Sequence, residues 1–318
     1  MSNQSYVRDD VRAFLDFLNA QEGPMMHELD PVSARGMMLA MRHVADADPT
    51  PLAMVKDMSC PGPRGPIKLR LYDARAIRDP GPVLVFYHGG GFVIGDIDTH
   101  EPFCTEAARV LDMPVVSVDY RMAPEDPWPA SPDDCEAAAR WVAGSPAELG
   151  RKVTALTLGG DSAGGNLAIV AAMRLRDNPA AVPVIAQLPI YPATDMGTEH
   201  PSFIEFADGY LLTKDSMDWF ANHYAADLTH ADASPGLFDQ RGMPPAVVIT
   251  ASLDPIRDQG RLYAKALADA GVDYEFMEMQ GTIHGFICLR KGVPSANADV
   301  ERLLQAFRRL LDRVTAAA

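Results

Sequence analysis

The chain has 318 residues, of which 47% are hydrophobic and 22% are charged, as is ordinary for a soluble globular enzyme. Its formal net charge of −15 argues against nucleic-acid and anionic-membrane partners, because an acidic surface repels phosphate groups. No apolar run approaches the ~20 residues that a membrane span requires. The first five residues lack the layout of a signal peptide, and the four scattered cysteines are interpreted as reduced thiols. We therefore expect a cytoplasmic protein.

Residues 1–45 are expected to form amphipathic helices. Apolar residues recur at helical spacing between Val11 and Leu18, with Phe17 among them. A methionine-rich cluster follows at 37–41, and it suits either a gap-filling core or an adaptable lining for an apolar ligand.

From residue 67 onward, strand-like and helix-like segments alternate. At 67–72, apolar and charged residues alternate, which is typical of a half-exposed strand. Further strands, most of them apolar throughout as buried strands are, are predicted at 82–87, 115–118, 153–158, 184–191, 246–250 and 274–279. Helices are predicted at 105–111, 134–142, 165–173, 260–270 and 297–314. This alternation favours an α/β fold with a mostly parallel central sheet and helices on both faces.

The segment 193–240 breaks this rhythm, since it is polar, interrupted by proline and rich in aromatic residues. We interpret it as an insertion that joins the N-terminal helices in a helical cap. The predicted organisation is a first cap segment at 1–45, the first part of the core at 46–192, a cap insertion at 193–240 and the second part of the core at 241–318.

The pentapeptide Gly160-Asp161-Ser162-Ala163-Gly164 lies between a predicted strand and an alanine-rich helix. This is the context that a nucleophile elbow requires, because neighbours without side chains let the turn close and the serine project from it. This context makes Ser162 the candidate nucleophile. The alternative is a glycine-rich turn that only connects the strand and the helix.

A serine needs a base, and the base needs a carboxylate that orients it. His284 follows the last predicted strand in a loop next to glycine, and Asp254 directly follows the strand at 246–250. The chain order Ser, Asp, His is that of an α/β-hydrolase triad. Asp258 is interpreted as a helix-capping or salt-bridge residue, and Glu278, inside a strand, is the weaker rival.

An oxyanion hole needs backbone N–H groups aimed at the developing negative charge. The expected donors are Ala163, which follows the nucleophile, and Gly89 and Gly90 in the glycine run after the strand at 82–87. A phosphate-binding loop is disfavoured, because Ile94 stands where a G-x-G-x-x-G pattern needs its third glycine.

These motifs together resemble the hormone-sensitive-lipase-like family of bacterial esterases in the α/β-hydrolase superfamily. The resemblance covers roughly residues 60–315 and rests on five segments: His88-Gly-Gly-Gly, Tyr120–Glu125, Gly160–Gly165, Asp254–Asp258 and His284-Gly285-Phe286. It implies an α/β-hydrolase fold with a helical cap, a triad of Ser162, His284 and Asp254, and no cofactor or metal. It also implies a homodimer formed through the edge strand at 274–279.

Four cap residues are expected to line an apolar substrate pocket: Met37, Phe203, Phe206 and Leu211. Asp161 is expected to be buried beneath the elbow, and Arg121 is expected to pair with a nearby carboxylate. The sequence thus predicts a carboxylesterase with small-molecule ester substrates, and the resemblance implies acyl chains of short to medium length. An amidase, a carbamate hydrolase or an acyltransferase would use the same triad. A ligand-binding protein on the same fold is disfavoured, because the catalytic histidine is present.

Overall fold

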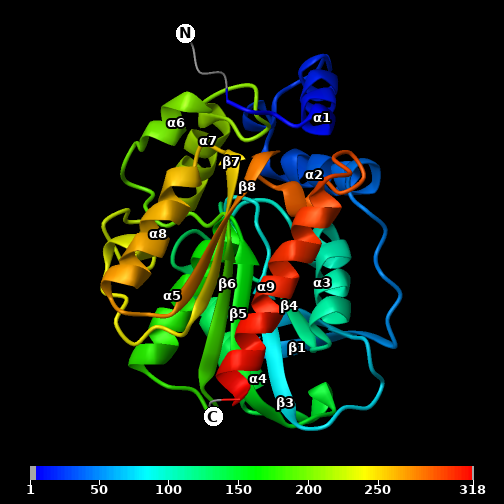
Figure 1. Cartoon of the computed structure of the whole chain (residues 1–318), viewed down its shortest axis with the longest axis vertical. Helices are drawn as coiled ribbons and strands as arrows, with labels where there is room; N and C mark the ends of the chain where they lie inside the picture. The colour runs from blue at the N-terminus through cyan, green and yellow to red at the C-terminus, as the bar shows by residue number, and fades with distance from the viewer. Residues whose placement is uncertain (1–4, 317–318) are drawn as a thin grey trace.

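A computed structural model describes residues 5–316, so the first four residues of the predicted cap segment and the last two of the core lie outside it. Within the described residues, the chain is built on one eight-stranded sheet with the strand order β1-β2-β4-β3-β5-β6-β7-β8 (Figure 1). The strands are β1 (Met54–Gly62), β2 (Gly65–Asp73), β3 (Gly81–Tyr87), β4 (Val115–Asp119), β5 (Val153–Asp161), β6 (Val184–Ile190), β7 (Ala246–Leu253) and β8 (Tyr274–Ile283). Strand β2 is antiparallel to both neighbours, and all other pairs are parallel. The predicted fold class is confirmed.

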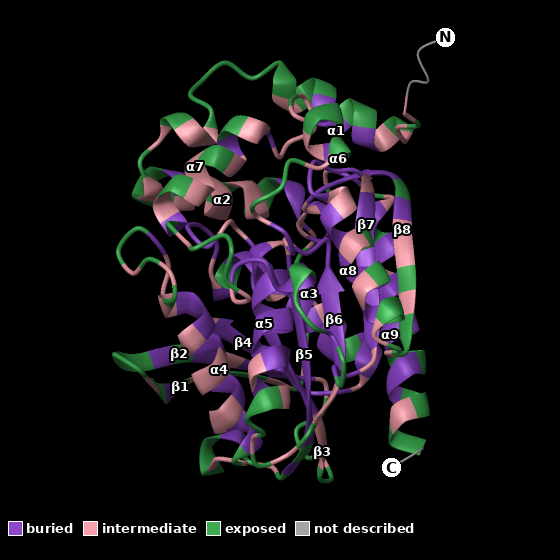
Figure 2. Ribbon diagram, turned by 90° about the vertical axis from the view of Figure 1, so that its left-hand side faces the viewer, coloured by how far each residue is buried: buried purple, intermediate pink, exposed green. Residues whose placement is uncertain are grey.

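Helices cover both faces of the sheet, whose strands are almost entirely buried at the centre (Figure 2). The apolar side chains of α3 and α9 pack with one face, and those of α4, α5 and α8 pack with the other. The α-helices are α1 (Asp9–Asn19), α2 (Pro31–Ala45), α3 (Ile97–Leu111), α4 (Ala130–Ala143), α5 (Ala163–Asp177), α6 (Pro201–Glu205), α7 (Lys214–Tyr224), α8 (Arg257–Asp269) and α9 (Ala296–Ala316). Short 3-10 helices are η1 (Met26–Glu28), η2 (Ala147–Leu149), η3 (Pro235–Leu237) and η4 (Phe286–Cys288).

Three local features differ from the sequence prediction. The edge strand β1 was not predicted, because most of its residues are exposed or half-exposed and it carries no apolar alternation. Helix α3 begins at Ile97 rather than 105, because the Asp96 side chain caps it there. The helix continues through Pro102, which lies within its second turn. Phe17 is 56% exposed, so it does not belong to the buried stripe of α1.

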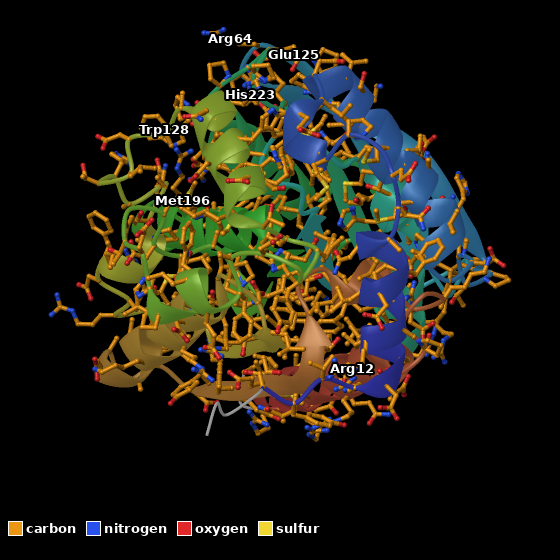
Figure 3. The ribbon with its side chains drawn as sticks, turned by 90° about the horizontal axis from the view of Figure 1, so that it is seen from above. Arg12, Arg64, Glu125, Trp128, Met196 and His223 are labelled. Atoms are coloured by element: carbon orange, nitrogen blue, oxygen red, sulfur yellow. The ribbon has the colours of Figure 1, made fainter. Side chains whose placement is uncertain are left out.

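The helices at 9–45 and 201–224 lie together at one end of the sheet (Figures 1 and 3). The two segments meet where η1 packs against α7. Arg35 of α2 fastens this end to the core, because its guanidinium donates to both carboxylate oxygens of Glu125 at 2.8 and 2.7 Å and to the Val93 carbonyl at 2.8 Å. The four-segment division at 45, 192 and 240 stays a prediction.

Strand β8 forms one edge of the sheet, and its Tyr274 and Phe276 side chains are each 37% exposed. The homodimer through this strand stays a prediction. Among the described helices, none combines the length and the apolar character needed to cross a membrane. All four cysteines are free thiols, three of them buried, as the sequence predicts.

Candidate active site

Ser162 lies in the sharp turn between β5 and α5. Its backbone φ of 55° and ψ of −118° depart from every common conformation of a non-glycine residue, as expected for a nucleophile elbow. Ser162 N–H donates to the Ile190 carbonyl at 2.9 Å, which fixes the turn against β6. At Gly164 an added Cβ would overlap the Tyr87 carbonyl, so only glycine lets the first turn of α5 approach β3 this closely. The hydrogen bond to Ile190 and the close packing at Gly164 therefore hold Ser162 in its strained conformation.

The three predicted triad residues lie within hydrogen-bond distance of one another. His284 Nε2 is 2.9 Å from Ser162 Oγ, and His284 Nδ1 is 2.7 Å from Asp254 Oδ2. Asp254 is fully buried, and its other oxygen accepts the Ile256 N–H at 2.8 Å, which orients the carboxylate. The Tyr191 ring packs against the His284 ring at 4.6 Å between centroids. This is the geometry in which a histidine can take the proton of a serine while a carboxylate holds it in position.

The rival carboxylates have structural partners. Asp258 accepts hydrogen bonds from Ser202 N–H and from the Arg257 and Arg261 side chains, each at 3.0 Å. Glu278 pairs with Arg261 at 2.8 Å. The interpretation of Asp258 as a structural residue is therefore confirmed. Arg121 pairs with the buried carboxylate of Asp134 at 2.7 Å, which confirms the expected ion pair beneath the site.

The prediction that Gly89 supplies an oxyanion donor is wrong. Its N–H donates to Asp161 Oδ1 at 2.8 Å and is therefore engaged inside the protein. The next two amides, of Gly90 and Gly91, donate to no acceptor within residues 5–316. The Ala163 amide opens helix α5, where the first N–H groups have no partner in the helix. Within residues 5–316, the unpaired amides of the glycine run and the elbow are thus those of Gly90, Gly91 and Ala163.

Asp161 is buried, as predicted, and it is the centre of a polar cluster under the glycine run. Besides the Gly89 amide, its carboxylate contacts His100 Nε2 at 3.2 Å and accepts the Tyr191 hydroxyl at 3.3 Å. Burial raises the pKa of Asp161, but the charge of His100 and the hydrogen bonds outweigh this, so the net pKa lies below its usual value. Asp161 therefore stays ionised inside the protein.

His100 is the cationic partner of this buried carboxylate. Thr99 Oγ1 lies 2.8 Å from the Asp96 carbonyl and 2.9 Å from His100 Nδ1, so when the hydroxyl donates to the carbonyl, His100 Nδ1–H donates to the hydroxyl. With Nε2–H directed at Asp161, both ring nitrogens carry protons. Burial lowers the pKa of His100, whereas Cys288 and Asp161 raise it, and the net shift is well above the usual value. No sequence motif points to His100, because it is a lone histidine in a helix.

Hydrogen bonds to successive backbone carbonyls fix the start of the glycine run. His88 Nδ1 lies 2.8 Å from the Gly89 carbonyl, and the Tyr120 hydroxyl donates to the His88 carbonyl at 2.7 Å. Burial and the nearby His100 lower the pKa of His88 to about 4, so the ring is neutral and its Nδ1–H is the donor. A positively charged His100 and a neutral His88 thus lie under the same loop.

The cap helix α7 packs onto the outer side of this loop. The Phe92 and Tyr224 rings are stacked at 3.8 Å between centroids. The Phe220 ring lies against Gly91, where an added Cβ would overlap it, and Gly91 has a φ of +60°. Helix α7 therefore leaves no room for a side chain at Gly91.

A pocket of about 130 Å³ opens beside Ser162 under α6 and α7. Of the four predicted lining residues it contains Phe203 alone. Phe206 is buried in the core against Tyr210, and Met37 and Leu211 do not border the pocket. The lining residues are Gly91, Phe92, Ser162, Ala163, Ala193, Met196, Phe203, Leu212, Met217, Asp218, Phe220, Ala221, Ile256 and Gln259. Figure 3 looks down on this end of the molecule and labels Met196.

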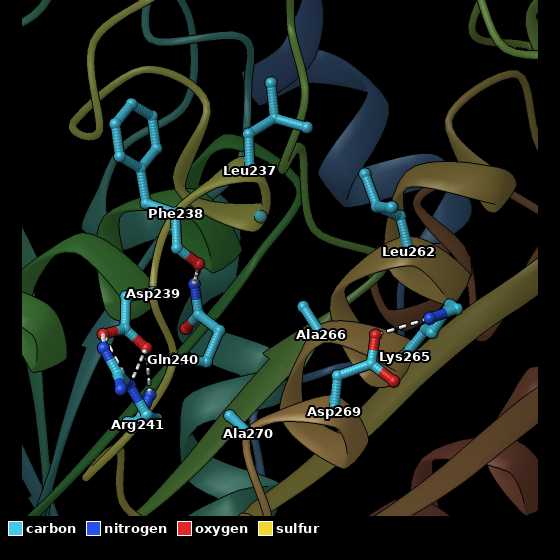
Figure 4. Close-up of a pocket in the computed structure, with 11 residues that line it drawn as sticks. Leu237, Phe238, Asp239, Gln240, Arg241, Leu262, Lys265, Ala266, Asp269 and Ala270 are labelled. Carbon is cyan, nitrogen blue, oxygen red and sulfur yellow. Dashed lines mark hydrogen bonds and ion pairs between the residues drawn. The ribbon is translucent and has the colours of Figure 1, made fainter.

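A wider hollow of about 500 Å³ lies between the segment 236–241 and helix α8 (Figure 4). Its charged side chains are paired within the hollow, Arg241 with Asp239 at 2.6 Å and Lys265 with Asp269. It contains none of the triad residues. The smaller pocket, which does contain Ser162, is the candidate substrate site.

Comparisons with known proteins identify the family of this chain. A family model described as "alpha/beta hydrolase fold" matches residues 84–288, a range that includes all three triad residues. Carboxylesterase NlhH of Mycobacterium tuberculosis is 41% identical over 252 residues, which are 77% of this chain and 79% of that protein. The chain belongs to the hormone-sensitive-lipase-like esterases of the α/β-hydrolase superfamily. Members of this family are serine carboxylic ester hydrolases.

Other hormone-sensitive-lipase-like esterases are similar over comparable lengths. The ethyl acetate hydrolase of Pseudomonas putida is 33% identical over 235 residues, 73% of this chain and 74% of that protein. The ester hydrolase EH1AB1 from the Lake Arreo metagenome, solved with a bipyridine phosphonate derivative, superposes with a TM-score of 0.91 at 37% identity. That likeness covers 96% of this chain and 99% of the other.

Proposed function

We propose that this protein is a carboxylesterase that hydrolyses short- to medium-chain acyl esters with Ser162 as nucleophile, His284 as base and Asp254 as the residue that orients the base. The observation that carries the proposal is the continuous chain of hydrogen bonds, at 2.9 and 2.7 Å, from Ser162 through His284 to Asp254. Ligand binding alone does not require a base that is hydrogen-bonded to a strained serine.

In the first step, Ser162 Oγ attacks the ester carbonyl while His284 Nε2 accepts its proton. The carbonyl oxygen becomes an oxyanion, which the amides of Gly90, Gly91 and Ala163 stabilise. His284 then gives the proton to the leaving alcohol, and an acyl-enzyme remains. Water, deprotonated by the same imidazole, attacks the acyl-enzyme and releases the acid.

The pocket beside Ser162 holds the acyl chain. The leaving alcohol must lie next to His284, which protonates it, yet His284 does not line the pocket. Ser162, Ala163 and Gly91 do line it, which supports placing the acyl chain rather than the alcohol in this pocket. A volume of about 130 Å³ suits a chain of a few carbons, which is the basis for proposing short to medium acyl groups.

The test is hydrolysis of p-nitrophenyl esters of increasing acyl length by the wild type, Ser162→Ala and His284→Ala. We expect the wild type to turn over the short and medium esters and each variant to lose ~10⁴-fold or more in kcat. Matched p-nitroanilides and carbamates distinguish an esterase from an amidase or carbamate hydrolase, and added alcohols reveal acyl transfer. A wild type inert on every ester would overturn the proposal. The cytoplasmic location stays a prediction.

A further inference from the structure

Gln259 is a polar side chain in an otherwise largely apolar pocket. It lies in the first turn of α8, is 5% exposed and borders the pocket that contains Ser162. Asp218 also borders the pocket, but it is exposed and pairs with Lys214 at 3.0 Å. Gln259 is thus the one side-chain amide among the lining residues.

The orientation of this amide follows from its partners. Gln259 Oε1 accepts the Thr194 N–H at 2.9 Å and the Asp195 N–H at 3.1 Å. Backbone N–H groups only donate, so the end of the side chain that they contact must be the oxygen. The Thr194 hydroxyl also donates to the Gln259 carbonyl at 2.7 Å, which fixes the backbone at the same place. The NH₂ group is therefore directed away from the segment at 194–195.

The NH₂ group is left without a protein acceptor. Within residues 5–316, Gln259 donates no side-chain hydrogen bond. Gln259 Nε2 is not one of the fully buried polar atoms that lack a hydrogen-bond partner, so part of its surface is accessible. It therefore faces open space, and the space that Gln259 borders is the acyl pocket. An unpaired donor at an apolar wall favours a ligand that brings an acceptor oxygen to it.

We propose that Gln259 is a specificity-determining residue that selects acyl chains carrying a hydrogen-bond acceptor, such as a ketone or ether oxygen, over plain alkyl chains. This inference rests on the proposed esterase function and names the substrate class within it. Gln259 does not touch the reacting atoms. It acts on the part of the acyl chain that enters the pocket beyond the carbonyl.

The experiment compares p-nitrophenyl pentanoate with its 4-oxopentanoate, and hexanoate with 5-oxohexanoate, in the wild type and in Gln259→Glu. Glutamate keeps one oxygen on the amides of Thr194 and Asp195 and replaces the NH₂ donor with a second acceptor. We expect the ratio of kcat/KM for the oxo ester to that for the alkyl ester to fall ~10-fold or more in at least one pair. Because the same two esters are compared in both enzymes, the change in this ratio from wild type to variant cancels the difference in their intrinsic reactivity. Gln305→Glu, on the exposed face of α9, is the charge-matched control and should keep the wild-type ratio.

Three outcomes would overturn the inference. One is an unchanged ratio in both pairs. The second is an equal loss on oxo and alkyl esters together with a lower Tm, which would make Gln259 a residue of the fold only. The third is a wild-type ratio equal to that of hydroxide-catalysed hydrolysis, a comparison that needs no variant to fold. Hydrolysis of the plain alkyl esters tests the esterase proposal separately.

Discussion

The carboxylate of Asp161 accepts the N–H of Gly89 at 2.8 Å, across 72 positions of sequence. Asp161, the residue directly before Ser162, thereby anchors the loop that carries the amides of Gly90 and Gly91, the proposed oxyanion donors. The elbow and the glycine run are consequently joined by a buried charge.

Replacing Asp161 with Asn removes the charge that pairs with His100. Breaking a buried ion pair costs about 3–5 kcal/mol of folding free energy, so Tm should fall by several degrees. Because Gly89 also loses its charged acceptor, we expect kcat to fall ~10–100-fold as the following amides lose their fixed positions, with little change in KM. Steady-state kinetics and thermal unfolding measure both effects, with the exposed Asp312→Asn as control. Unchanged kcat in a destabilised variant would restrict Asp161 to a role in stability.

The His100–Asp161 pair predicts a pH dependence of stability. The folded-state pKa of His100 is raised above 6.5, so its contribution is complete below about pH 6.5 and is lost as pH rises through the raised value. The pKa of Asp161 is lowered from 3.8, so its contribution is present above about pH 3.8 and is lost as pH falls through the lowered value. The difference in unfolding free energy between wild type and His100→Gln should therefore shrink toward alkaline pH. Urea titrations from pH 6 to 10 measure it, and a constant difference would contradict the charged pair.

Gly91→Ala should damage catalysis through the cap. The new methyl group would overlap the Phe220 ring, and φ of +60° strains any residue with a Cβ. Displacing an oxyanion donor costs ~10²–10³-fold in kcat. Adding Phe220→Ala should restore part of the loss, because it relieves the overlap but not the strain. Gly36→Ala, on α2 with open space around it, is the control and should keep full activity. Full activity in Gly91→Ala would exclude its amide from the oxyanion hole.

Phe203→Ala should shift the preference toward longer acyl chains. Phe203 borders the pocket, and truncating it extends the space available to the end of the chain. Each additional buried methylene contributes about 0.8 kcal/mol, so kcat/KM for the octanoate should rise several-fold relative to the butyrate. Phe238→Ala, in the separate hollow at 236–241, should leave the profile as it is. A profile that responds to Phe238 instead would move the substrate to that hollow.

The hydrogen-bonded arrangement of Ser162, His284 and Asp254 was predictable, because each of these residues follows a strand that the local pattern reveals. Ser162, Asp254 and His284 come after β5, β7 and β8, whose ends meet at one edge of the sheet. Their order along the chain, Ser, Asp and His, is that of an α/β-hydrolase triad, so a role can be proposed for each residue without knowledge of the packing.

The oxyanion donors and the pocket depend on packing between distant segments. The sequence shows three adjacent glycines but not that Asp161 takes the amide of Gly89. Phe203 and Phe206 are three residues apart and equally apolar, yet one borders the pocket and the other is buried against Tyr210. In the same way, Gln259 gains its role from the amides at 194–195, which no local pattern connects with it.

The central claim is that Ser162 is the nucleophile that His284 activates. The most direct measurement is reaction with diethyl p-nitrophenyl phosphate, followed by intact-mass and peptide mass spectrometry of the wild type, Ser162→Ala and His284→Ala. The account predicts one diethyl phosphoryl group per chain, on the peptide that contains Ser162. It predicts none on Ser162→Ala and a much slower reaction of His284→Ala. Stoichiometric labelling of another residue, or full esterase activity in Ser162→Ala, would contradict it.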